Sequence, residues 1–390
     1  MSVGTDDIID DAVTDAKLSL DSVYTVWRES LGVDSLSQIL FKRNTISFDP
    51  SIIVASSGTY ERPAVTASGN NVYVLWDGRT LESRDILYRR STDGGASFGG
   101  IVNLSNTAAF SVSPVLAASG NNVYVVWIED TAPGVRDILY RRSTDGGASF
   151  GGIVNLTENT ASDAEETAIA ASGNNVYVLW SNFPNVGNVD ILYKKSTNGG
   201  ASFGDTKNLS NNTTGDSREP AVAASGNNVY VVWRGRESIP GNQEIMYRRS
   251  TNGGANFGGI VNLSNNTGFS QHPTVAVSGN NVYVVWQDDS LVPGTFDILY
   301  KKSTNGGASF GDTKNLSNSA GNSGRPTVAV SGNNVYVVWH DNTTQGGVAQ
   351  FDILYRRSTN GGANFGGIVN LSNTAQASTT PSIAASNNLT

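Results

Sequence analysis

The stretch STDGGASF stands unchanged at residues 91–98 and 143–150. It returns as STNGGASF at 196–203 and 303–310, and as STNGGANF at 250–257 and 358–365. Ser, Thr, Asp and Asn accept backbone N–H bonds in tight turns, and paired glycines adopt positive φ without a steric cost. The six copies therefore indicate a turn that a larger repeated unit carries at one fixed place.

The repeated unit is about fifty residues long and its period is marked by tryptophan. One unit holds four strand signals, PAVTA, NVYVLW, DILYRRS and FGGIVNLS, and no helical periodicity. Four strands per unit predict an all-β fold, a β-propeller of four-stranded antiparallel blades. All the tryptophans occupy one position of the unit and so predict seven blades: Trp27, Trp76, Trp127, Trp180, Trp233, Trp286 and Trp339.

The two ends of the chain are expected to close the ring. The C-terminal TPSIAASNNLT repeats a first strand and then stops, whereas DSVYTVW at 21–27 is a second strand with no good first strand before it. We predict that residues 381–386, with 382–385 as the strand itself, complete the blade begun at 22–54. Residues 11–20 are the competing candidate for that place. Residues 1–21 are otherwise expected to be a disordered acidic tail, and 22–390 a single propeller domain.

Composition excludes several classes of function. The chain has no Cys, which rules out disulfides and thiolate sites, and its net charge of −8 argues against nucleic-acid binding. No apolar run approaches the roughly 18 residues of a membrane helix, and no signal-peptide core follows Met1. We expect no membrane insertion, no cofactor and a monomer. The expected location is extracellular or at the cell surface, with the targeting signal absent from this chain.

The six turns resemble the Asp-box, Ser/Thr-x-Asp-x-Gly-x-Thr/Ser-Trp/Phe, of sialidase-like (BNR) repeat propellers. The first unit has only a worn version, RNTISF at 43–48. The resemblance implies a hairpin between third and fourth strands on the face away from the active site, although sialidases usually have six blades and this chain counts seven units. Asn keeps the acceptor oxygen of Asp but not its charge, which suits a turn better than a metal site. The structural box residues are Asp93, Asp145, Asn198, Asn252, Asn305 and Asn360.

Divergence among the sister repeats separates two faces of the predicted ring. Strand direction places the nearly identical SGNN turns and the Asp-boxes on one face, and two variable stretches per unit on the other, the variable-loop face. The first-strand ring, where the chain enters the first strands, is Arg62, Ser113, Glu166, Glu219, His272, Arg325 and Thr380. The second-strand ring, directly after each Trp, is Arg28, Asp77, Ile128, Ser181, Arg234, Gln287 and His340.

These rings supply the candidate ligand-binding residues. Closure would place Arg325, Arg28 and Arg62 on three consecutive blades, as an anion clamp similar to the three arginines of sialidases. The candidates across from them are Glu166 and Glu219, and the two histidines are His272 and His340. Surface arginines that merely pair with loop carboxylates such as Glu29 and Glu61 are the structural alternative.

Catalytic residues are not identifiable from the sequence. A sialidase-like mechanism requires a Tyr nucleophile with a Glu base, yet thirteen of the fourteen Tyr occupy repeat positions. Tyr60 is off-pattern, but its neighbour Glu61 points to the opposite side of a strand. The two histidines have no partners at a fixed metal-ligand spacing, so no metal site is predicted.

We therefore expect a non-catalytic binding or interaction propeller that recognises a glycan or a protein through the variable-loop face. One alternative is a sialidase-like exo-glycosidase acting on anionic sugars. The other is a recently amplified structural repeat with no selective ligand. Equivalent sugar pockets between neighbouring blades would favour a lectin. The basic pairs of the third strands, such as Arg89-Arg90 and Arg141-Arg142, are expected to form a solvated stripe paired with acids.

Overall fold

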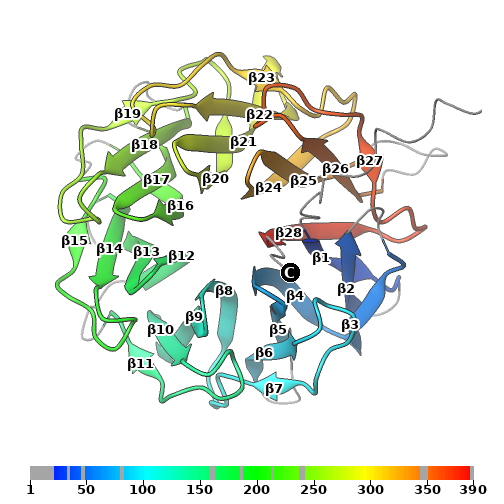
Figure 1. Cartoon of the computed structure of the whole chain (residues 1–390), viewed down its shortest axis with the longest axis vertical. Helices are drawn as coiled ribbons and strands as arrows, with labels where there is room; N and C mark the ends of the chain where they lie inside the picture. Colours follow the sequence, from blue (N-terminus) through cyan, green and yellow to red (C-terminus); the bar gives the residue numbers. More distant parts are fainter. Residues whose placement is uncertain are drawn as a thin grey trace, which may run out of the picture.

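A computed structural model describes residues 22–32, 36–44, 49–79, 83–157, 163–184, 188–211, 215–236, 242–342 and 350–386. This part of the chain forms seven four-stranded antiparallel sheets arranged in a ring, as Figure 1 shows. The seven-bladed propeller predicted from the tryptophan period is confirmed. Within the described ranges there is no helix of the length and apolarity needed to cross a membrane.

Every blade presents the same strand order, with its first strand nearest the ring axis and its fourth strand at the rim (Figure 1). The first strands are β28 (Ser378–Ser386), β4 (Tyr60–Ser68), β8 (Ser111–Ser119), β12 (Asp163–Ser172), β16 (Ser217–Ser225), β20 (Ser270–Ser278) and β24 (Ser323–Ser331). The second strands are β1 (Ser22–Ser30), β5 (Asn71–Arg79), β9 (Asn122–Ala132), β13 (Asn175–Phe183), β17 (Asn228–Gly235), β21 (Asn281–Val292) and β25 (Asn334–Asp341).

The outer half of each blade is less regular. The third strands are β2 (Ser37–Asn44), β6 (Arg84–Ser91), β10 (Val135–Ser143), β14 (Asp190–Ser196), β18 (Glu244–Ser250), β22 (Thr295–Ser303) and β26 (Asp352–Ser358). The fourth strands are β3 (Ile52–Gly58), β7 (Val102–Asn103), β11 (Val154–Asn155), β15 (Lys207–Asn208), β19 (Val261–Asn262), β23 (Lys314–Asn315) and β27 (Val369–Asn370). Blade 1 contains β28 and β1–β3, and blades 2 to 7 follow in chain order.

Ring closure by the C-terminus is confirmed. In blade 1, β28 pairs antiparallel with β1, from Ser22↔Ser386 to Glu29↔Ser378, so the innermost place is filled by the end of the chain. The strand starts three residues before the predicted 381–386. Residues 1–21, which include the competing segment 11–20, and the worn turn at 45–48 lie outside the described residues.

The predicted fourth strand FGGIVNLS is wrong in length, because six of the seven fourth strands contain only two residues. Phe98 leaves the sheet to pack against the core of the preceding blade, where its ring meets Phe41 edge-on at 4.9 Å. Pairing with the third strand then resumes only at Val102 and Asn103. In blade 1, whose turn lacks the paired glycines, β3 runs for seven residues.

The hydrophobic core lies between blades. Each tryptophan is at most 2% exposed, and the buried clusters combine strands of consecutive blades, such as Tyr73 and Tyr88 with Val125 and Trp127. Repeating this contact around the ring stabilises each blade through its neighbours.

The Asp-box turns are closed by their own side chains. Asp93 accepts bonds from Ser91 Oγ (2.6 Å), Ser97 N (2.9 Å) and Ser97 Oγ (2.5 Å). These bonds, that of Ser91 first, hold the pKa of Asp93 below its usual range. Asn198 reproduces the arrangement, because Oδ1 accepts from Ser196 Oγ and Ser202 N while Nδ2 donates to Ser202 Oγ. The Ser–Asn bond recurs at Asn252, Asn305 and Asn360, and the Ser–Asp bond at Asp145.

The basic pairs of the third strands do not form the predicted acid-paired stripe. Arg89 donates to the carbonyl oxygens of Gly99 and Phe98 in its own blade and of Val54 in the preceding blade. Arg90 donates to Gly146 O of the next blade at 2.8 Å. These guanidinium groups join neighbouring blades through backbone carbonyls of the outermost strand, as at Val54, and of the Asp-box turn, as at Gly146.

Candidate functional site

The first-strand ring is built by a repeated backbone irregularity. In each blade the pairing of first and second strands shifts register around two residues, for example between Glu61 and Ala64 in β4. The first of the two has a left-handed φ of 46–55° in every blade, and none is glycine: Arg62, Ser113, Glu166, Glu219, His272, Arg325 and Thr380.

Such a conformation is unusual for residues with a Cβ, and each one carries a cost of roughly 1–3 kcal/mol. In six blades the second bulge residue is proline, which has no N–H to leave unpaired; blade 4 has Thr167 there instead. A proline within six of the seven first strands is the sequence signal that indicates the bulge. The repeat period predicts that these seven residues are equivalent, whereas their left-handed backbone conformation is seen only in the structure.

On one side of the ring the carboxylates are already bonded within the protein. Glu166 Oε2 accepts from Ser181 Oγ and from the backbone N of Glu219, each at 2.7 Å. Glu219 Oε2 in turn accepts from the backbone N of His272 at 2.7 Å, and Oε1 pairs with Arg234 Nε at 3.2 Å. Burial raises the pKa of Glu166. Each carboxylate therefore caps the bulge of the following blade.

The histidines of blades 6 and 7 lie beside Arg325. Burial, then Arg325 and His272, lower the pKa of His340 to about 4. Burial also lowers the pKa of His272, opposed by Glu219, with Arg325 and Arg234 adding to the lowering. His340 Nδ1 is buried and accepts no hydrogen bond from the described residues. Both rings are consequently uncharged near pH 7, and of the two arginines that act on them Arg234 is paired with Glu219.

The three candidate arginines lie on blades 7, 1 and 2, as predicted from closure. Arg62 and Arg325 are exposed, and Arg28 is partly buried. Arg28 Nε donates to Tyr60 O at 2.9 Å, and Arg62 Nη1 donates to Ser113 Oγ at 2.8 Å. Among the described residues none accepts a hydrogen bond from the Arg325 guanidinium or forms an ion pair with it. The backbone N of Arg325 donates to Gln287 Oε1 at 3.0 Å.

Glu29 and Glu61, the loop carboxylates named as alternative partners of the candidate arginines, contact other side chains. Glu61 pairs with Arg84 at 3.2 Å, and Glu29 accepts from Gln38 Nε2 at 3.1 Å. Arg84 also lies 3.4 Å from Asp77, a fully buried carboxylate of the second-strand ring. Burial raises the pKa of Asp77 to about 7, against the attraction of Arg84 and Arg62.

A sialidase-like nucleophile is not assembled around Tyr60. Its hydroxyl donates to Ser56 O at 3.3 Å, its ring lies edge-on to Trp76, and the neighbouring Glu61 is held by Arg84. Among the described residues no group of three or more His, Asp or Glu is arranged to hold a metal ion.

The fold of this chain is similar to that of solved propeller structures. No protein-family model and no curated protein matches the sequence. The polysaccharide lyase Uly1 superposes with a TM-score of 0.59 at 10% identity, over 90% of this chain and 88% of the lyase. The chain is structurally similar to sialidase-type propellers. A mutant Trypanosoma rangeli sialidase displaying trans-sialidase activity superposes with a TM-score of 0.51 at 14% identity.

That superposition covers 78% of this chain and 56% of the trypanosomal protein, so the chain spans little more than half of that sialidase. A protein of unknown function from Dyadobacter fermentans DSM 18053 superposes with a TM-score of 0.53 at 14% identity, over 75% of this chain and 93% of its own. At these identities the likeness concerns the fold. The resemblance inferred from the Asp-boxes is confirmed at that level.

Proposed function

We propose that the chain is a non-catalytic binding propeller that recognises an anionic glycan on the variable-loop face. The ligand site comprises Arg325, Arg28 and Arg62, on blades 7, 1 and 2. The observation that carries the proposal is the left-handed bulge at every first strand, which presents five kinds of side chain (Arg, Ser, Glu, His and Thr) around the ring. Backbone strain repeated at one ring of otherwise near-identical blades is typical of a functional position.

The distribution of partners favours an anion as the ligand. Glu166 and Glu219 have intramolecular donors, whereas Arg62 and Arg325 are exposed and the Arg325 guanidinium has no described partner. The neighbouring histidines, His272 and His340, are neutral and so do not repel the Arg325 guanidinium. Their ring nitrogens are hydrogen-bonding groups beside it. Two solved proteins with this fold are a polysaccharide lyase and a sialidase, which makes carboxylated sugars the first ligands to test.

The contacts of Tyr60 and Glu61 support a binding role over sialidase-like hydrolysis. The Tyr60 hydroxyl, which would be the nucleophile, donates to a backbone carbonyl, and the carboxylate of Glu61, which would be the base, is paired with Arg84. A nucleophile requires a base within hydrogen-bond reach, and this pair has none.

The first prediction concerns binding to an array of carboxylated, sulfated and neutral glycans at low and moderate salt. We expect selective binding to carboxylated sugars. Arg62→Ala and Arg325→Ala should each weaken it by roughly tenfold or more, since a charge-assisted hydrogen bond contributes about 1.5–3 kcal/mol. Arg136→Ala is the matched control, because Arg136 is a partly exposed arginine of the same face that pairs with Asp130 and Glu165. Silence across the carboxylated sugars, or an equal loss in Arg136→Ala, would contradict the proposal.

A further inference from the structure

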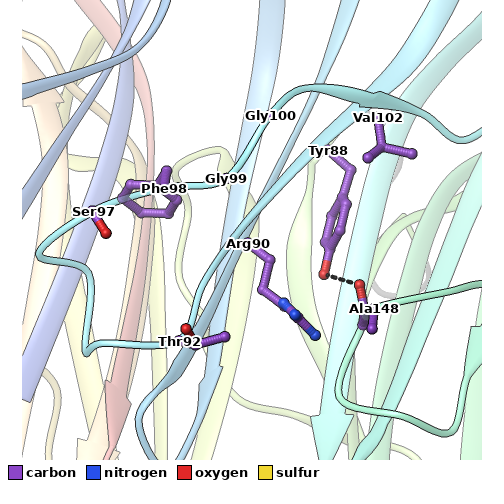
Figure 2. Close-up of a pocket in the computed structure, with 10 residues that line it drawn as sticks. Tyr88, Arg90, Thr92, Ser97, Phe98, Gly99, Gly100, Val102 and Ala148 are labelled. Carbon is purple, nitrogen blue, oxygen red and sulfur yellow. Dashed lines mark hydrogen bonds between the residues drawn. The ribbon is translucent and has the colours of Figure 1, made fainter.

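The face of the ring opposite the variable-loop face carries the Asp-boxes and is called the Asp-box face. It contains pockets between neighbouring Asp-boxes. One lies between blades 2 and 3 and has a volume of about 420 Å³. Figure 2 shows Phe98, Arg90 and Tyr88 arranged across it, with Val102 beside Tyr88 and Ala148 of the next blade at the far wall. Thr92 and Ser97 add hydroxyl groups at its edge.

The same pocket recurs between blades 6 and 7, with a volume of about 470 Å³. Its walls are the repeat equivalents of the first, with Tyr300 for Tyr88, Lys302 for Arg90 and Phe310 for Phe98. Thr304 and Ser309 supply the hydroxyl groups, and Gly362 and Ala363 form the wall from the next blade. The same hollow is therefore present at both of these junctions, although Asp312 and Lys314 stand where the first pocket has Gly100 and Val102.

The walls of the pocket are held in place before any ligand arrives. Tyr88 Oη donates to Gly147 O at 3.1 Å, and Arg90 Nη1 donates to Gly146 O at 2.8 Å. In the second pocket Tyr300 Oη donates to Gly362 O at 3.2 Å. Both contacts cross the junction between blades, so little ordering is required on binding.

The lining combines groups that a sugar ring requires. Val102 is 48% exposed, and Phe98 is partly exposed, which offers an apolar surface for the C–H face of a pyranose. Thr92 and Ser97 are exposed hydroxyls, and Arg90 has further N–H groups besides the one given to Gly146. A few polar groups around an apolar wall are the usual composition of a small-ligand pocket.

We propose that these inter-blade pockets bind pyranose rings of a glycan, which makes the Asp-box face a multivalent carbohydrate-binding surface. The six boxes of the sequence provide five junctions between consecutive boxes. Each pocket is open and makes few contacts, so single-site affinity is weak and binding to a glycan-coated surface depends on several pockets acting together. This site is separate from the arginine site on the variable-loop face.

The glycines after the box phenylalanine allow a clean occlusion test. A Cβ at Gly100, Gly152 or Gly259 would meet no atom within 4 Å, and Gly100 lines the first pocket, so we expect tryptophan at these positions to occlude the pockets without a clash at Cβ. Gly367 has the same open surroundings in blade 7, whose next neighbour, blade 1, lacks the paired glycines. It is the matched control.

The second prediction uses surfaces coated with neutral monosaccharides (galactose, mannose, glucose and N-acetylglucosamine), and the same free sugars as competitors. We expect the protein to bind at least one coated surface roughly a hundredfold more tightly than the free sugar. The triple variant Gly100→Trp, Gly152→Trp and Gly259→Trp should lose at least about tenfold, and Gly367→Trp should not. The variant Val102→Asp, Val154→Asp and Val261→Asp should repeat the loss without added bulk.

Several outcomes would overturn the proposal: no binding to any coated surface, unchanged binding in both triple variants, or an equal loss in Gly367→Trp. The double variant Arg62→Ala and Arg325→Ala separates the two sites, because it should abolish binding of carboxylated sugars and leave this binding unchanged. Equal thermal melting of the variants and the parent protein provides the check on folding.

Discussion

At the scale of single residues, Asp77 shows how a near-identical repeat accommodates one ionisable group. Its position in the other blades holds Arg, Ile, Ser, Gln or His. The carboxylate is fully buried, lies 3.4 Å from Arg84 Nη1, and receives no hydrogen bond from a described residue. Burial without hydrogen-bond donors disfavours the charged form, which is why its pKa is raised to about 7.

The third prediction follows from this shift. The native pKa of about 7 exceeds the ordinary 3.8, so the native state keeps a proton that the unfolded chain releases. The stability from the protonated group is complete below the unfolded pKa and is lost as pH rises through 7. Asp77→Asn should therefore stabilise the protein by about 3 kcal/mol more at pH 8 than at pH 5, because two pH units separate pH 5 from the native pKa and each unit corresponds to about 1.4 kcal/mol.

Thermal melts at the two pH values test this, with Asp130→Asn as the control at an exposed carboxylate paired with Arg136. A difference in melting temperature that is the same at pH 5 and pH 8 would show that Asp77 is ionised throughout this range.

The sequence could predict which residues share a ring but not which of them touch. Arg62 and Arg325 were found by counting positions in a repeat, because equivalent positions lie at equivalent places in a propeller. The backbone N of Glu219 donates a hydrogen bond to Glu166 in the preceding blade. This contact depends on the bulge at Glu219, which points the N–H towards that blade. Its only trace in the sequence is a proline in the first strand, and blade 4 lacks even that.

At the scale of elements, the Asp-box acts as the joint between blades. Gly147 combines a φ of +77° with a carbonyl that accepts from Tyr88 Oη, and an added Cβ would lie 2.2 Å from that oxygen. The preceding Gly146 donates to Asn121 O of its own blade and accepts from Arg90 of the blade before. The turn therefore requires glycine for both its conformation and its contact.

The fourth prediction is that Gly147→Ala destabilises the protein by about 2–3 kcal/mol. The left-handed conformation accounts for roughly 1–2 kcal/mol, and displacement of Tyr88 adds the loss of a hydrogen bond. Gly152→Ala is the control, since its Cβ would meet no atom within 4 Å and its φ is not left-handed. Denaturant midpoints measure the effect. Equal midpoints for the two variants would contradict the role given to the turn.

The Asp-box also explains why the fourth strands were mispredicted. The letters FGGIVNLS have a β-like composition, and they do not show that the fourth strand is interrupted where Phe98 packs against the neighbouring blade. The prediction that Arg89 belongs to a solvated stripe failed for the same reason. Its acceptors are a carbonyl of another blade and one of the segment that leaves the sheet, and neither can be located from the sequence. Local patterns predict pairing within a blade, whereas contacts between blades depend on the assembled ring.

At the scale of the whole molecule, stability depends on a strand that joins the two ends of the chain. β28 covers the inner edge of β1 from Ser22 to Glu29, and Ile383 and Ala384 are each 8% exposed in the core. Ser382 Oγ accepts from Val65 N at 3.2 Å, and Ser386 Oγ donates to Gly69 O at 3.1 Å, so the strand also contacts blade 2. Its removal would expose an edge in blade 1 and open the contact between blades 1 and 2.

The fifth prediction is that a chain ending at Ala377 melts about 10 °C or more below the full chain and aggregates through the exposed edge of β1. A chain ending at Ser386 keeps every contact of β28 and is the control. Addition of a synthetic peptide of residues 376–390 should restore much of the melting temperature, since an extended peptide pairs with a free sheet edge through its backbone. If the shorter chain melts like the full one, the ring does not depend on closure, and each pair of neighbouring blades must supply its own stability.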